Sequence, residues 1–159
     1  MNSSQYLRNP SEYVLLVKAY LETSLAVGLI SSYKRVSTAV EGIEFSYRVG
    51  FSKITDKVNN DGRETHEVEL IFSVVANTSS ELFDLDALDA TSRVEREFQN
   101  QLFGLGDTLE RPHYIVNEPQ IIDQEHGYFI RTVTIRQYVK IGNPEQETFE
   151  LGEGGLNVS

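Results

Sequence analysis

The spacing of hydrophobic positions changes several times along the chain, and each change marks a predicted element. Near the N-terminus, apolar side chains recur every three or four residues, at Val14, Val17, Leu21 and Leu25. This spacing is typical of a helix with one apolar face. Asn9 and Pro10 suit the start of such a helix, and Glu12 occupies the capping-box position. With Gly28 as the stop, we predict an amphipathic helix from about Pro10 to Ala26.

The next pattern, from residue 42 to residue 77, has a period of two. Apolar side chains alternate with polar ones, first at Ile43, Phe45, Tyr47, Val49 and Phe51, then at Val68, Leu70, Phe72 and Val74. The intervening Asn-Asn-Asp-Gly at 59–62 is typical of a tight turn. We therefore predict a long antiparallel β-hairpin with one buried face. Ile71 and Val75 add apolar positions on the opposite face, so the second half of the returning strand is predicted to be covered on both sides.

The middle of this hairpin carries polar residues where no core pattern requires them. Between residues 53 and 64 charged and amide side chains dominate, and the tip is predicted to project beyond the core. We interpret it as a contact surface, made of Lys53, Asp56, Lys57, Asn59, Asn60, Asp61, Arg63 and Glu64.

Helical spacing returns after the hairpin. Its apolar positions are Ala87, Ala90, Val94, Phe98 and Leu102. The acidic side chains of Asp84, Asp86 and Asp89 lie where a helix dipole favours negative charge. We predict a second helix from about Asp86 to Phe103, ended by Gly104.

The last part of the chain is predicted to contain extended strands. Residues 111–124 contain two prolines, which suit an edge strand or a loop. Residues 127–141 alternate again, and Arg131 and Gln137 interrupt their apolar face. The order helix, hairpin, helix, strands predicts one α+β domain over residues 1–142, with an antiparallel sheet and both helices on one face. Residues 143–159 are acidic and without periodicity, and are predicted to form a flexible tail.

The amino-acid composition limits the kinds of functional site that the chain can form. The chain has no cysteine, which excludes disulfides and thiolate sites, and no apolar run long enough to span a membrane. His66, His113 and His126 stand in no zinc-like spacing, and no nucleophile elbow, phosphate-binding loop or dinucleotide fingerprint occurs. We predict no catalytic residues, no metal and no cofactor. A small enzyme whose site is assembled from scattered acids stays open as an alternative.

The charge balance bears on partners. The formal net charge of −10 repels a phosphate backbone, so specific DNA binding is not expected. The same charge fits either ordinary solubility or a surface past which DNA moves without being held.

The succession of elements resembles the tail terminator proteins of long-tailed bacteriophages. The resemblance covers roughly residues 10–142: a leading amphipathic helix, two long strands, the link SVVANTSSE into a second helix, and a closing strand GYFIRTVTIRQYVK. It implies a homo-oligomeric ring, usually a hexamer, that caps the tail tube in the virion and joins it to the head connector, while DNA passes through the lumen. Assembly in the host cytoplasm, with no membrane partner, is the corresponding expectation.

Two alternatives remain beside it. Other neck or tail completion proteins share the size and character of this chain. An acidic α+β protein with apolar strands is also distantly similar to the bacterial export chaperone SecB, although the helices of that family follow its sheet. Binding of unfolded polypeptide would favour the chaperone.

Overall fold

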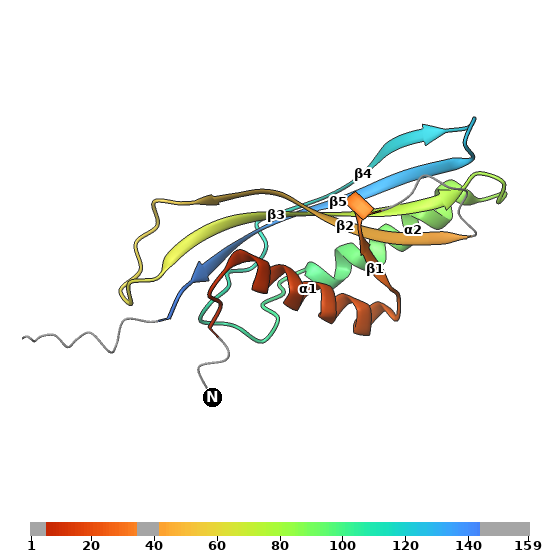
Figure 1. Cartoon of the computed structure of the whole chain (residues 1–159). Coiled ribbons are helices and arrows are strands. Elements are labelled where there is room, and N and C mark those ends of the chain that lie inside the picture. Colours follow the sequence, from red (N-terminus) through yellow and green to blue (C-terminus); the bar gives the residue numbers. More distant parts are fainter. Residues whose placement is uncertain (1–5, 35–41, 144–159) are drawn as a thin grey trace, which may run out of the picture.

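The computed structural model describes residues 6–34 and 42–143, and in this part of the chain five strands form one sheet below which two helices lie (Figure 1). The strand order is β1-β2-β3-β5-β4. The bounds are β1 Leu29–Ser31, β2 Ile43–Ile54, β3 Glu64–Asn77, β4 Tyr114–Asp123 and β5 Tyr128–Ile141. The predicted α+β fold, with both helices on one face, is confirmed. The predicted acidic tail, apart from Asn143, lies outside the described residues.

Helix α1, Pro10–Leu25, follows the prediction at its start and departs from it at its end. Glu12 accepts a hydrogen bond from the backbone N of Arg8 at 2.9 Å, one residue before the expected capping-box partner Asn9. The left-handed residue that ends the helix is Ala26, with a φ of 55°. The prediction that Gly28 is the stop was therefore wrong, because the chain must turn earlier for β1 to reach β2.

Helix α2 runs from Phe83 to Phe98, so the predicted Asp86–Phe103 was wrong at both ends. Asn100 and Phe103 adopt left-handed φ values of 58° and 50°, which break the helix. The turn brings the Phe103 ring to 5.5 Å from that of Phe98 and 5.1 Å from that of Tyr20. Apolar residues beyond Phe98 therefore serve the core through a folded-back loop, although their spacing continued the helical pattern.

Strands β2 and β3 are consecutive antiparallel partners, and a bulge changes the register of β2. Val49 lies opposite Leu70, whereas the next partner pair is Ser52 and Val68. The extra residue reverses which face each later side chain occupies. Phe51, predicted on the buried apolar face, therefore lies on the opposite face. Gly50 is in this bulge, where a Cβ would overlap the Glu69 carboxylate.

A short strand that the sequence pattern did not predict makes the sheet mixed. Residues Leu29–Ser31 of β1 pair in parallel with Phe45–Tyr47 of β2, whereas every other strand pair is antiparallel. The carboxylate of Glu22 accepts a hydrogen bond from the backbone N of Leu29 at 2.9 Å and fixes the approach. Three residues are too few to show a period, so only the tertiary contact identifies this strand.

The hydrophobic core lies between the sheet and the two helices. It is built mainly from Tyr13, Val17 and Leu21 of α1, Val94 and Phe98 of α2, Leu70, Phe72 and Val74 of β3, and Val133 and Ile135 of β5. On the other face of β3, Ile71 and Val75 are only 9% and 1% exposed, which confirms that its second half is covered on both sides. No helix in the described part of the chain is long and apolar enough to cross a membrane.

Candidate functional site: the β2–β3 tip and the helix-free face

The residues that join β2 to β3, numbers 55–63, extend beyond the helices at one end of the sheet (Figure 1). Their shape is held by hydrogen bonds within the segment. The side-chain amide of Asn59 donates to the carbonyl oxygen of Arg63 at 2.7 Å and to the Thr65 hydroxyl at 2.8 Å. The backbone N of Thr55 donates to the Thr65 carbonyl at 2.8 Å. The tip is thus an ordered extension of the ladder.

Arg63 anchors this tip to the body of the protein. Its side chain is 3% exposed and lies 2.8 Å from the Asp61 carboxylate. The guanidinium also donates to the Thr108 hydroxyl and to the carbonyl of Asp107, both at 3.0 Å. Arg63 was predicted as a contact residue of the surface, but the structure places its charged group inward.

Asp61 completes the anchor electrostatically. Burial by itself raises the pKa of Asp61, but two hydrogen bonds from Arg63, with the positive charges of Arg63 and Lys140, outweigh it. The pKa of this carboxyl therefore lies below its ordinary value. A groove of about 440 Å³ beside the pair is lined by Tyr6, Arg63, Asp107, Glu110 and Lys140, among others.

The remaining predicted contact residues divide into two groups. Lys53 and Lys57 reach back over the sheet, where they lie 3.5 Å from Glu67 and 3.3 Å from Glu110 respectively. Both lysine side chains nevertheless stay exposed, at 63% and 41%, as do those of Asp56, Asn60 and Glu64. Val58, an apolar residue that was not among the predicted contact residues, is 91% exposed. The outermost surface of the tip is therefore smaller than predicted and includes an apolar residue.

Next to the tip, the helix-free face of the sheet carries a stacked pair of rings. His113 lies parallel to Tyr138 with ring centroids 4.3 Å apart, and the Lys57 ammonium lies 4.3 Å from the Tyr138 centroid. His113 Nε2 is 2.7 Å from the Glu67 carboxylate. The sequence pattern predicted no partner for His113, because Glu67 lies 46 positions earlier in the chain, on β3.

A second cluster lies two residues further along β3 and β5, on the same face. Arg136 is hydrogen-bonded to Glu69 at 3.0 Å, and its guanidinium carbon lies 4.1 Å from the Tyr114 ring and 5.1 Å from the Phe51 ring. Cross-strand pairing places Arg136 directly opposite both Glu69 and Tyr114. Contacts of cations with aromatic rings and with cross-strand carboxylates add stabilising interactions on this face.

Glu67 lies between Lys53 of β2 and His113, and its ionisation should affect stability. Burial raises its pKa, but hydrogen bonds and charges from His113 and Lys53 outweigh this and lower the pKa below the ordinary 4.5. A carboxyl whose pKa is lower in the folded state stabilises the fold above its unfolded pKa, and this contribution disappears as the pH falls through the folded pKa.

We therefore predict that Glu67→Gln destabilises the protein by about 1.5–3 kcal/mol near neutral pH, the range for a hydrogen bond to a charged group. The difference from wild type should shrink steadily as the pH falls below 4.5. Urea unfolding over a pH series measures both free energies of unfolding. The exposed Glu125→Gln is the control, and a difference for Glu67→Gln that does not change with pH would contradict the interpretation.

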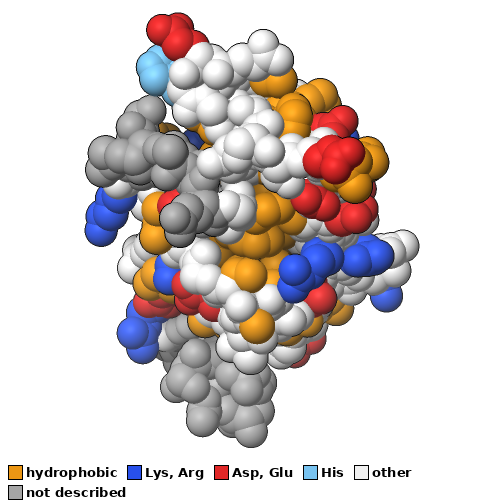
Figure 2. Space-filling model, turned by 90° about the vertical axis from the view of Figure 1, so that its right-hand side faces the viewer, with side chains coloured by type: hydrophobic (Ala, Val, Ile, Leu, Met, Phe, Trp, Pro, Cys, Tyr) orange, Lys and Arg blue, Asp and Glu red, His pale blue; other side chains and the backbone are white. Residues whose placement is uncertain are grey.

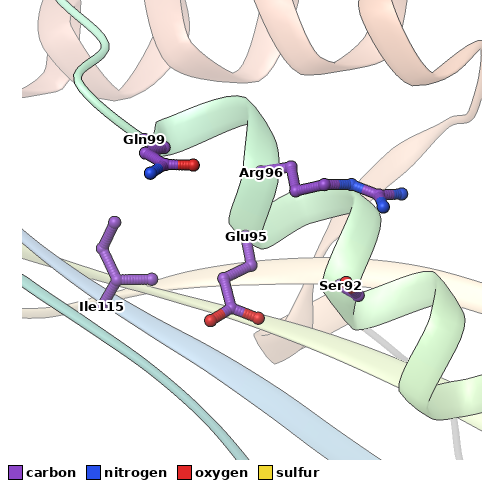
Figure 3. Close-up of a pocket in the computed structure, with 5 residues that line it drawn as sticks. All are labelled: Ser92, Glu95, Arg96, Gln99 and Ile115. Atoms are coloured by element: carbon purple, nitrogen blue, oxygen red, sulfur yellow. The ribbon is translucent and has the colours of Figure 1, made fainter.

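A third feature lies on the helix side, between α2 and β4. Figure 3 shows Ser92, Glu95 and Arg96 on α2, Gln99 directly after its end, and Ile115 on β4. These residues line a groove of about 420 Å³. Glu95 points toward the sheet and accepts a hydrogen bond from Asn117 at 3.1 Å, whereas Arg96 points away. Within the described residues no group of three or more His, Asp or Glu side chains is placed to hold a metal ion.

Comparisons with known proteins do not assign the chain to a family. No model of a known protein family matches the sequence, and no curated protein sequence matches it. The functional proposal therefore depends on the geometry above and on the resemblance in element order.

Proposed function

We propose that this chain is a structural virion protein, a ring-forming tail terminator that caps a phage tail tube and joins it to the head connector. The observation that carries the proposal is the difference between the two sides of the sheet. One side ends in β4 with α2 beside it, and the other ends in β1 and β2, where β2 and α1 line a common cleft. Copies that place one side against the other make head-to-tail contacts, which form a ring when the rotation between copies closes.

The tip and the helix-free face support contacts along the axis of such a ring. The tip extends beyond the helices yet is held rigidly by Arg63 and Asn59, which lowers the entropic cost of binding. Its outermost side chains are polar, apart from Val58. We assign these residues to contact with the tail tube protein, and DNA to passage through the lumen without specific binding.

The first test is the state of assembly. Sedimentation velocity and native mass spectrometry of the purified chain, alone and with tail tubes, should show a closed ring, with a hexamer as the expected size. A chain that stays monomeric and never associates with tubes would overturn the proposal. Micromolar binding of an unfolded polypeptide would favour the chaperone instead.

The second test addresses the tip. Val58→Glu should leave the melting temperature unchanged, because the side chain is 91% exposed, and should weaken tube capping by about tenfold or more, as expected when an interface centre receives a charge. Deleting the whole segment is unsuitable, since this would remove Arg63 and its buried contacts. Glu125→Gln serves as the matched surface control, and unchanged capping by Val58→Glu would exclude the tip as the contact.

A further inference from the structure

Three leucines at the start of α2 are exposed, although α2 is otherwise amphipathic. Leu82, Leu85 and Leu88 are 54%, 50% and 39% exposed, whereas the buried side of the helix is formed by Ala87, Ala90, Thr91, Val94 and Phe98. Leu85 and Leu88 are one turn apart and form an apolar ridge. Contiguous apolar side chains at a surface mark an interaction site more often than scattered ones do.

Acidic residues surround this ridge. Glu81, Asp84, Asp86 and Asp89 are all exposed, and the segment 81–89 contains no lysine or arginine. Figure 2, which views the end of the molecule where α2 begins, shows acidic side chains interleaved with hydrophobic ones on one side. The partner of this surface should therefore be apolar at its centre and basic at its margin.

A cleft with that character lies on the other side of the molecule. It has a volume of about 300 Å³ and is lined by Ser11, Val14 and Leu15 of α1, Ser31, Tyr33, and Tyr47, Arg48 and Val49 of β2. Tyr33 and Leu15 at its margin are 78% and 59% exposed. Arg48 is the one charged residue of this lining, and the exposed Lys34 directly follows Tyr33.

We propose that the ridge of Leu85 and Leu88 docks into this cleft on a second copy of the chain. The inference rests on the proposed function, because it takes another copy as the occupant. A helical ridge laid in an apolar groove is a recurrent recognition mode, and the acidic flank of α2 then faces Lys34 at the margin of the cleft.

The contact is head-to-tail, because two different surfaces of the chain meet in it. The ridge belongs to α2, which packs against β3, β4 and β5, whereas the cleft is formed by α1, β2, the end of β1 and Tyr33. Each copy therefore uses its ridge on one neighbour and its cleft on the other. Repetition of a heterologous contact forms a ring when the rotation between copies closes.

The test uses one blocked variant for each surface. Leu85→Lys blocks the ridge and Leu15→Lys blocks the cleft, and both positions are exposed enough for the fold to tolerate lysine. Each variant alone should lose association by about tenfold or more, measured by sedimentation velocity over a concentration series. Ile54→Lys, at a position that is 61% exposed and outside both surfaces, should associate as wild type does.

Mixing the two blocked variants separates this contact from a symmetric one. One intact ridge and one intact cleft remain in the mixture, so native mass spectrometry should show a species of two chains that goes no further. The proposed contact is overturned if the mixture stays monomeric, or if either single variant associates like wild type. The proposed function still stands in that case, provided that the wild-type chain forms rings.

Charge reversal provides an independent arm. Asp84→Arg with Asp89→Arg should weaken association, and Lys34→Glu in the mixing partner should restore part of it. If the wild-type chain associates but does not cap tail tubes, the proposed function is overturned and the proposed contact is kept. A wild-type chain that is monomeric at every concentration overturns both.

Discussion

Replacing Gln137 with leucine should lower the free energy of unfolding by about 3 kcal/mol or more, because each buried polar group left without a partner costs about 1–3 kcal/mol. Gln137 lies on the helix-facing side of β5 and is 0% exposed. Its side-chain oxygen accepts a hydrogen bond from the Tyr13 hydroxyl at 2.6 Å. Its amide donates to the carbonyls of Gln101 at 2.9 Å and Glu110 at 2.7 Å.

One amide thus joins four parts of the chain: α1, the loop after α2, the segment before β4, and β5. Burial raises the pKa of Tyr13 well above its ordinary value, so the phenol stays protonated and donates. Leucine has a similar volume but satisfies none of these groups. The loss should therefore appear as a lower stability of the whole fold, with an unchanged denaturant m-value.

Chemical unfolding measures the effect, and Gln120→Leu is the matched control. Gln120 is exposed on β4, so the same substitution there should change stability by no more than about 0.5 kcal/mol. Tyr13→Phe and the double variant complete a cycle that isolates the coupling between the two side chains. Equal effects at positions 137 and 120 would show that the buried network contributes nothing.

Arg63→Ala is expected to cost about 2–3 kcal/mol, below the full value for a broken buried pair because Asp61 is 29% exposed and can be rehydrated. The substitution leaves the Thr108 hydroxyl and the Asp107 carbonyl without their donor. It also removes the link between the tip and the loop at 106–110.

Two measurements separate these consequences. Urea unfolding reports the global loss, and amide hydrogen exchange should accelerate at residues 55–63 before it does so in the core strands. Arg111→Ala, at an exposed position, is the control and should be near neutral. Unchanged exchange at the tip would mean that its own hydrogen bonds at Asn59 are sufficient to hold it.

Much of the fold could be predicted from local pattern. The start of α1, the antiparallel pairing of β2 with β3, the apolar face of β5 and the placement of both helices all follow from periodicity and from the need to bury one face. The polarity of the tip also follows, since no core position repeats there.

Other features depended on contacts between residues far apart in the sequence. The end of α2 was placed too late because Leu102 continues the helical spacing, whereas the chain turns after Phe98 and packs the Phe103 ring back on that of Phe98. The face of Phe51 was wrong because a bulge shifts the period by one residue. Arg63 was assigned to the surface because no sequence pattern shows that Thr108, 45 positions away, would receive its guanidinium.

The sequence by itself determined the class of fold, the acidic balance and the position of the tip, because these follow from composition and from periods of two and 3.6 residues. Only the tertiary structure decided which polar residues are buried and which apolar ones are not. Gln137 and Arg63 point inward to partners on other elements, whereas Leu85 and Val58 remain exposed. The physical reason is that burial depends on what the rest of the chain places beside a residue, and this is set by long-range packing.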